Sequence, residues 1–505
     1  MVDRVFTNCE VRPRPGDGET ARAVAVTGDR ITAVGDPEAV APASAERVDC
    51  GGGVLLPGFV DAHTHLDVVG RREAEADLGG ADGPADCVDR LLAADDGDGW
   101  MLGFGYDEGE WGGRRLRASD LDEASADRPV AAFREDLHTV SVNHAALDRL
   151  DLPASSVESE DGAPTGVLVE DAAEAVFDAV APDRERTREY LLAAQDVALA
   201  EGVTAVHDMV RRSHAPRVYR DLDLAGDLAL RVRLNYWRDH LDAVREVGLA
   251  TNHGSERVEV GAIKTFVDGA IGSSTARLRE PYSDAADEDA VGAWRLPPDE
   301  LRELVAEVSE AGLQLSAHAI GDAAIETVLE AVAAVGEGES ANARHRVEHA
   351  EVLTGDLVER LGASALVVSA QPNFHRWAGP GGLYADRLGE RRVETNRFRD
   401  LLDAGATLAF GSDCMPLGPL YGVEHAVTAP TPGQRLTVGE AIRAYTHGGA
   451  VAGFDEHRLG TVETGKLADF AVLAASPWTV AADAVADVDV TMTVSGGEVV
   501  FDARR

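Results

Sequence analysis

The pattern of hydrophobic and polar positions predicts a central region in which short strands alternate with helices. The strands appear as short apolar runs. The segments between them repeat apolar side chains at three- and four-residue intervals. In one of them Leu301, Leu304, Val305 and Val308 share a face, and Gly312 ends the helix. Buried strands that alternate with amphipathic helices are typical of a parallel α/β architecture.

Eight candidate strands can be placed along this region. They span 55–63, 203–207, 230–236, 258–266, 313–318, 345–349, 366–371 and 407–412. Eight such strands with interposed helices predict a (β/α)8 TIM barrel. The first two strands are separated by far more residues than a normal βα loop contains, so we expect an inserted subdomain there.

Both ends of the chain have a different pattern, with short strands separated by glycine-rich turns. Each end is too short to fold alone, so we expect the two to pair into one composite β-sandwich. The predicted division is 1–56 for the first sandwich part, 57–70 for the first barrel strand, 71–185 for the insert, 186–458 for the rest of the barrel and 459–505 for the second sandwich part.

The net charge of the chain argues against some classes of binding partner. The chain of 505 residues has a formal net charge of −42, and its acidic residues are spread along the whole length. This excess argues against nucleic acid and anionic membrane as partners. It suits a cytoplasm at very high salt, where self-repulsion is screened, so we hypothesise a halophilic protein.

Two further patterns favour a cytoplasmic location. The sequence shows neither a secretory leader pattern nor an apolar run long enough to span a membrane. Its four cysteines lack a CxxC spacing, which favours reduced thiols. Only two residues are lysine, Lys264 and Lys466. A lysine retained against this bias can do what arginine cannot, such as react as a neutral amine.

Metal-binding residue types follow several predicted strands. His63 and His65 lie two positions apart at the end of the first strand, so both side chains can face one ion. Alone, such a pair is also compatible with ordinary hydrogen-bonded histidines. Four other strand ends add candidate ligands: Lys264, His318, His349 and Asp413. Glu348 precedes His349 and would face the opposite side of a regular strand, so indirect support of the site is left open.

These motifs together resemble the amidohydrolase superfamily, specifically its amidohydrolase-3 branch of N-substituted formamide deformylase-like enzymes. The resemblance covers nearly the whole chain. The matching segments are PGFVDAHTHLD at 57–67, GFGYDEGEW at 103–111, LHTVSVNHAAL at 137–147, GVTAVHD at 202–208, IKTFVDGAIGSSTA at 263–276, HAIGDAAI at 318–325, HRVEHAE at 345–351, GSDCMP at 411–416 and GTVETGKLADFAVL at 460–473.

The resemblance implies a binuclear hydrolase of a non-peptide carbon–nitrogen bond, such as an amide or formamide. His63, His65 and Asp413 would bind the more buried ion, His318 and His349 the second, and an N-carboxylated Lys264 would bridge them. Metal-bound hydroxide would attack the carbonyl carbon, with Asp413 as general base and then acid. The catalytic residues would thus be Asp413 and Lys264.

The metal, assembly and substrate are less constrained. Two zinc ions are expected, with iron, manganese or cobalt as alternatives, and one ion against two stays open. A homodimer is a family-level expectation. Trp111, His138 and Arg376 are candidate contacts for a small-molecule substrate, although such aromatic residues can equally form the core of the insert.

The second strand ends in two further polar residues, and other functions are compatible with the same fold. His207 and Asp208 are candidates to orient the ligands from behind, or to make strand-end hydrogen bonds. Rival functions are hydrolysis of an ester, hydrolysis of a cyclic amide, and a catalytically silent scaffold with the same fold.

Overall fold

The computed structural model divides the chain into two compact units. We call Met1–His65, Gln195–Arg212 and Tyr219–Arg505 the barrel unit, and Leu66–Ala194 with Ser213–Val218 the insert unit. The structure describes residues 2–95, 97, 99–150, 152, 157–160, 163–169, 171–211, 213–287, 289–336 and 343–504.

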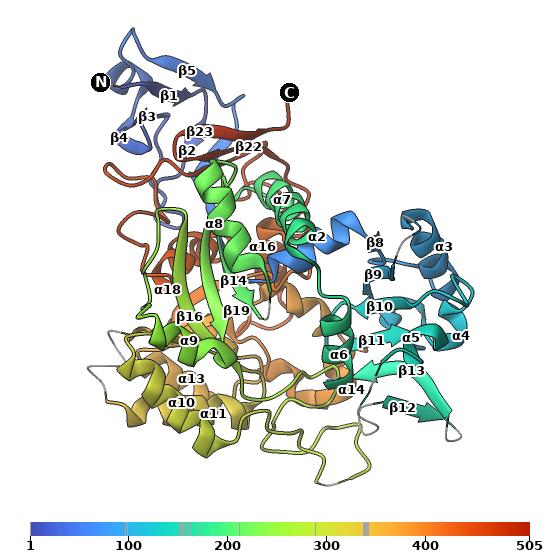
Figure 1. Cartoon of the computed structure of the whole chain (residues 1–505). Helices are drawn as coiled ribbons and strands as arrows, with labels where there is room; N and C mark the ends of the chain where they lie inside the picture. Colours follow the sequence, from blue (N-terminus) through green and yellow to red (C-terminus); the bar gives the residue numbers. More distant parts are fainter. Residues whose placement is uncertain are drawn as a thin grey trace. The chain divides into compact units, whose positions relative to one another are not determined.

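The centre of the barrel unit is an eight-stranded parallel sheet (Figure 1). Its strands in order are β7 (Phe59–Thr64), β14 (Val203–Val210), β15 (Arg231–Trp237), β16 (Val258–Phe266), β17 (Gln314–Ala319), β18 (Arg346–His349), β19 (Val367–Ala370) and β20 (Thr407–Phe410). The predicted TIM barrel is confirmed, and seven of its expected strands are present as predicted. The expected first strand, 55–63, is divided at Gly58: Val54–Pro57 forms β6 of another sheet, and the barrel strand β7 begins only at Phe59.

The barrel is closed where its first and last strands meet. The backbone N–H of Asp413, just after β20, donates to the carbonyl oxygen of His63 in β7 at 2.8 Å. The N–H of Ser412 donates to Asp61 Oδ1 at 3.0 Å. These contacts bring the carboxyl ends of two strands that are far apart in the sequence to the same rim.

Helices between the strands complete the barrel unit. In α10 (Pro298–Glu310), Pro298 stands in the first turn, and Leu301, Val305 and Val308 are buried. The other helices, including short 3-10 and π turns, are α8 (Ala215–Ala225), which begins in the insert unit, η3 (Arg238–His240), α9 (Leu241–Glu246), α11 (Asp322–Ala334), α13 (Gly355–Ala363), η4 (Pro372–Trp377), α14 (Leu383–Leu388), η5 (Gly389–Glu394), α15 (Phe398–Asp403), α16 (Pro419–Thr428), α17 (Val438–Arg443), η6 (Ala444–Gly448) and α18 (Gly449–Ala452).

A sandwich of two sheets joins the two ends of the chain. One sheet has the order β4-β3-β1-β5 and the other β2-β6-β21-β22-β23. The strands are β1 (Arg4–Thr7), β2 (Glu10–Val11), β3 (Ala23–Thr27), β4 (Arg30–Gly35), β5 (Glu46–Asp49), β6 (Val54–Pro57), β21 (Phe470–Leu473), β22 (Val490–Ser495) and β23 (Glu498–Asp502), with α1 (Pro37–Val40) and η7 (Ala482–Ala484) beside them.

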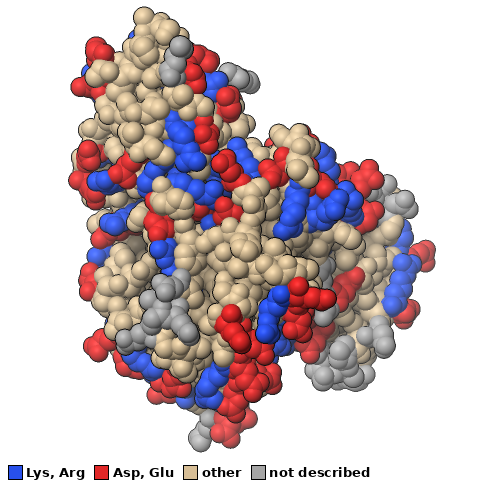
Figure 2. Space-filling view, turned by 60° about the vertical axis from the view of Figure 1, so that its left-hand side comes forward, with Lys and Arg blue, Asp and Glu red and all other residues tan. Residues whose placement is uncertain are grey.

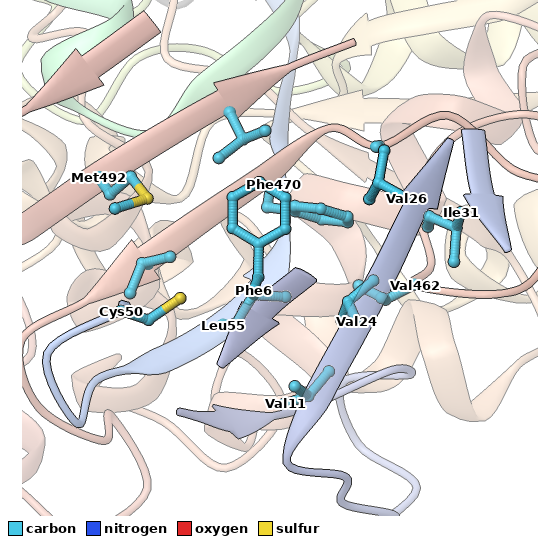
Figure 3. Close-up of a cluster of buried hydrophobic side chains, with 13 residues drawn as sticks. Phe6, Val11, Val24, Val26, Ile31, Cys50, Leu55, Val462, Phe470 and Met492 are labelled. Carbon is cyan, nitrogen blue, oxygen red and sulfur yellow. The ribbon is translucent and has the colours of Figure 1, made fainter. Parts of the chain in front are cut away.

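The core of the sandwich draws on both ends of the sequence. Figure 3 shows Phe6 and Val24 from the N-terminal strands packed with Phe470 and Met492 from the C-terminal ones. The rings of Phe6 and Phe470 meet edge to face at 5.4 Å. Because each contributes one side of a single buried cluster, neither end could bury its apolar face alone.

The insert unit has its own mixed sheet in the order β12-β13-β11-β10-β9-β8. Phe104 stacks on Phe133 at 4.5 Å inside it. Its elements are α2 (Leu66–Ala74), β8 (Ala76–Asp77), α3 (Pro84–Ala94), β9 (Met101–Tyr106), η1 (Glu108–Trp111), α4 (Ala118–Leu121), β10 (Val130–Arg134), β11 (Thr139–Val142), α5 (His144–Leu147), β12 (Val157–Glu160), β13 (Ala163–Val169), α6 (Asp171–Ala179) and most of α7 (Arg184–Ala200). Throughout the described part of the chain, each helix is too short or too polar to cross a membrane.

Candidate metal centre

Six side chains from five barrel strands come together at the rim where the strands end. One ligand atom from each of His63, His349 and Asp413 lies within 4.8 Å of the others. His65 Nε2 is 3.3 Å from Asp413 Oδ1, and Lys264 Nζ is 3.4 Å from His63 Nε2. The ring of His318 lies 4.5 Å from that of His349. The structure thus brings together every residue that the sequence nominated as a metal ligand.

The backbone turns sharply at two of these strand ends. Four residues there have positive φ values of 69°, 48°, 52° and 56°: His349 at the end of β18, Ala350 after it, and Asp413 and Cys414 after β20. Positive φ costs a side-chain-bearing residue about 1–2 kcal/mol, and such strain collects at functional sites. Here it ends the strand alternation and redirects the side chains at the rim.

In three of the histidines, one ring nitrogen lies within hydrogen-bond distance of an oxygen atom. His63 Nδ1 lies 2.7 Å from Glu348 Oε2, and His349 Nδ1 lies 2.8 Å from Gln371 Oε1. His318 Nε2 lies 3.1 Å from the carbonyl oxygen of Gly269. A ring nitrogen beside an oxygen acceptor carries the proton, so the neutral ring has its lone pair on the other nitrogen. This arrangement is typical of metal-bound histidines and fits a cation between them.

The charge states fit the same interpretation. Burial and the neighbouring Lys264 lower the pKa of His63 to about 4, and burial holds the pKa of His349 well below its usual range. Both rings are therefore neutral at neutral pH, as metal binding requires. Burial opposes ionisation of Asp413, but His63 and His65 beside it hold the pKa of that carboxyl below its usual range.

Lys264 is fully buried, and its surroundings differ from those of an ordinary ion-paired lysine. Its Nζ has His63 Nε2 at 3.4 Å and the ring of Phe266 at 5.6 Å. Among the described residues, no carboxylate oxygen lies within the 4.0 Å of a salt bridge. Burial lowers its pKa to about 8, which raises the fraction of neutral amine.

Residues that the sequence analysis did not assign hold the ligands from inside the barrel. Glu348 bonds His63 as described, and its Oε1 accepts a hydrogen bond from Ser316 Oγ at 2.7 Å. Arg346 Nε lies 2.8 Å from the same Oε1, and its Nη2 donates to Glu348 Oε2 at 3.0 Å and to Ser369 Oγ at 2.9 Å. Burial would raise the pKa of Glu348, but Arg346 and His63 hold it well below its usual range.

We predict that Glu348→Gln weakens metal binding by roughly 10–100-fold, because the charge that fixes the His63 tautomer is lost. Chelator competition in high salt measures the affinity, and thermal unfolding of the same samples monitors the cost of leaving Arg346 without its carboxylate. Glu330→Gln, an exposed position on α11, is the matched control. Unchanged affinity in the Glu348 variant would show that this carboxylate does not support the site.

The two residues nominated to orient the ligands have different neighbours. His207 Nδ1 accepts a hydrogen bond from Arg346 Nη1 at 2.8 Å, so it joins the Glu348 network. Asp208 Oδ2 accepts one from the hydroxyl of Tyr219 at 2.7 Å. An orienting role for either residue stays a prediction.

The candidate substrate contacts lie in both units. Arg376 belongs to η4, after β19 in the barrel unit. Trp111 and His138 belong to the insert unit. The indole N–H of Trp111 donates to the carbonyl oxygen of Arg114 at 2.7 Å, and its ring packs against the insert core. The substrate contacts predicted for Trp111 and His138 stay predictions.

Known proteins are similar to this chain over most of its length. A family model described as "Amidohydrolase family" matches residues 46–501. YtcJ of Bacillus subtilis (strain 168) is 30% identical over 96% of this chain and 97% of that protein. The N-substituted formamide deformylase of Arthrobacter pascens is 28% identical over 98% of each. The crystal structure of an uncharacterized metal-dependent hydrolase from Pyrococcus furiosus superposes with a TM-score of 0.78 at 28% identity, over 94% of this chain and all of that one.

Proposed function

Because the chain belongs to the amidohydrolase family, we propose that it is a metal-dependent hydrolase of a non-peptide carbon–nitrogen bond, an amide or formamide, in a small molecule. The observation that carries the proposal is the convergence of His63, His65, Lys264, His318, His349 and Asp413 at one barrel rim. The formamide deformylase relative, aligned over nearly the whole chain, supports this bond type.

Each ligand has a role in this proposal. His63, His65 and Asp413 would hold one divalent ion, His318 and His349 a second, and Lys264 as a carbamate would lie between the two. Zinc is the first choice, and iron, manganese or cobalt also suit imidazole and carboxylate ligands. Such ions supply Lewis acidity, which lowers the pKa of water and polarises a carbonyl.

A carbamate on Lys264 requires an amine that is neutral part of the time and reacts with carbon dioxide. Burial of the Nζ and its distance from carboxylates both support this chemistry. The carbamate would also turn a buried cation among histidines into an anionic ligand, which better suits a divalent ion. Arginine could not replace it, because its guanidinium does not lose its proton in proteins.

Asp413 is the residue proposed to move the proton. It lies at the same rim as the histidines, with Oδ1 3.3 Å from His65 Nε2 and 3.7 Å from His63 Nε2. As a carboxylate it can take a proton from the attacking water and return it to the departing nitrogen. The second transfer is needed because an unprotonated amine anion is a poor leaving group.

The proposal is tested with protein purified in high salt, stripped of metal and reloaded with zinc, manganese, cobalt or iron. The panel contains formamides, N-acyl amino acids, cyclic amides and matched esters. We expect amide hydrolysis that returns with metal, and a metal content that approaches two ions per chain. His63→Ala should lose both, because one ligand and its link to Glu348 disappear. Normal folding without metal and without hydrolysis would favour the scaffold function, and preference for esters or cyclic amides would favour those alternatives.

A further inference from the structure

Two of the four cysteines lie side by side in the sandwich of the barrel unit. Cys50 is among the buried side chains of its core (Figure 3), and Cys9 is half-buried against the same cluster. A hydrogen bond joins the two thiols. They are far apart in the sequence, so no short spacing marks them as a pair. The fold therefore creates a thiol pair that the sequence alone does not reveal.

Backbone hydrogen bonds hold the two cysteines at the separation of neighbouring strands. At the end of the parallel pair of β1 and β5, the N–H of Cys50 donates to the carbonyl oxygen of Thr7 at 2.9 Å. Just beyond it, the N–H of Glu10, next to Cys9, donates to the carbonyl oxygen of Gly53 at 2.9 Å. Neighbouring strands lie about 4.8 Å apart, and a disulfide needs about 4.4–6.8 Å between its Cα atoms. The backbone can therefore accept a disulfide here with little movement.

The two thiols differ in reactivity. Cys9 is partly exposed, so a small oxidant can reach its sulfur. The hydrogen bond with Cys9 and burial raise the pKa of Cys50 well above its usual range, while the guanidinium of Arg504 acts in the opposite direction. Because a thiolate, and not a thiol, attacks a disulfide, we expect Cys9 to react first and Cys50 second.

We propose that Cys9 and Cys50 form a disulfide by exchange with small disulfides. The Cys9 thiolate attacks one sulfur of the small disulfide, displaces the first small thiolate and remains in a mixed disulfide. Cys50 loses its proton to solvent, attacks Cys9 Sγ and releases the second small thiolate. Both protein thiols are oxidised, and one small disulfide is reduced to two thiols. This modification site goes beyond the proposed hydrolysis and does not depend on it.

The disulfide has a consequence for the stability of the sandwich. It closes a loop over residues 10–49, which contain β2, β3, β4, α1 and β5. These elements form most of the N-terminal part of a sandwich whose other part lies at the far end of the sequence. A link between Cys9 and Cys50 restricts the unfolded chain and so stabilises the folded one. The melting temperature of the linked protein should rise by about 2–4 °C in a chain of this size.

The test exposes the reduced protein in high salt to the uncharged disulfide of 2-mercaptoethanol. An uncharged oxidant is chosen because a net charge of −42 repels anionic ones. Thiols titrated in denaturant should fall from four per chain to two. Mass spectrometry of an unreduced tryptic digest should find peptides 5–22 and 48–71 joined, with the loss of two hydrogen atoms. Thermal unfolding of the same samples measures the stabilisation.

Single variants test the order of the two steps. Cys50→Ala, which keeps an apolar side chain in the core, should stop the reaction at the mixed disulfide on Cys9. Cys9→Ser should leave Cys50 unmodified. The control is Cys87→Ser: Cys87 is buried in the insert unit, where burial raises its pKa to about 12, and the link should still form without it.

Two results would overturn the inference. One is a wild-type digest without the joined peptides, and the other is reaction of Cys50 with the small disulfide in the Cys9→Ser variant. A joined digest with an unchanged melting temperature would overturn the stabilising role of the link. Each of these measurements is made without substrate and without metal, so the outcome is independent of the proposed hydrolysis.

Discussion

Lys264→Ala is expected to lose hydrolysis and at least part of the metal content of the protein. Removing a residue that only hydrogen-bonds to a metal ligand typically lowers activity by roughly 10–100-fold. The loss in Lys264→Ala should be larger, because a ligand shared by both proposed ions would disappear. Lys264→Arg should be equally inactive, since it keeps the positive charge and cannot form a carbamate. Metal analysis and activity on the best amide of the panel measure both effects.

The chain offers an unusually clean control for this experiment. Lys466 is its only other lysine, and its Nζ donates to the carbonyl oxygen of Leu459 at 3.0 Å in the turn before β21. Lys466→Arg should therefore keep activity and metal. With labelled bicarbonate, carbon-13 spectra should show a carbamate signal in this variant and lose it in Lys264→Ala. Full activity of Lys264→Arg would show that no carbamate is needed.

Dilute buffer is expected to destabilise the protein strongly. The chain has 89 acidic and 47 basic residues, and Figure 2 shows acidic side chains scattered over the visible face, several of them beside basic ones. Exposed ion pairs contribute only about 0–1 kcal/mol each, so they do not offset the surplus of negative charge. Stability of folded proteins is only about 5–15 kcal/mol, and unscreened repulsion can remove a large share of it.

Raising potassium chloride from 0.1 M to 3 M should therefore raise the melting temperature by about 5 °C, because each kcal/mol shifts the midpoint of a chain of this size by roughly 1 °C. Thermal unfolding followed by circular dichroism at fixed pH measures it. Sucrose at matched osmolality is the control, because it favours compact states without screening charge. An equal rise in sucrose, or full activity and stability in dilute buffer, would contradict the halophilic hypothesis.

The parts of the site that could be predicted are those attached to visible strand patterns. His318 and Asp413 follow apolar runs, and parallel strands bring such ends to one rim. Glu348 was harder to assign, because strand alternation assumes a regular backbone and His349 has a positive φ. Gln371 had no signal beyond its position after β19. Its contact with the site is seen only in the structure, where Gln371 Oε1 lies 2.8 Å from His349 Nδ1.

Arg346 shows a second reason why sequence patterns are insufficient. An arginine in a strand is normally expected at the surface, yet this side chain is 1% exposed inside the barrel. Its partners come from β7, β14, β18 and β19, including the carbonyl oxygen of Ala62 and the ring of His207. Only the closed barrel brings these groups together, so no local pattern could reveal the network.

Closure through β7 and β20 also has a consequence for the order in which the protein is made. During synthesis the strand that carries His63 leaves the ribosome long before the segment that carries Asp413, and its edge waits without that neighbour. β6 lacks its partner for even longer, because β21, which pairs with it in the sandwich, is made later still. Contacts so distant in sequence form slowly, and unpaired strand edges invite aggregation. If these residues bind metal as proposed, the complete ligand set can form only after almost the whole polypeptide has emerged, because Asp413 is its last member in the sequence.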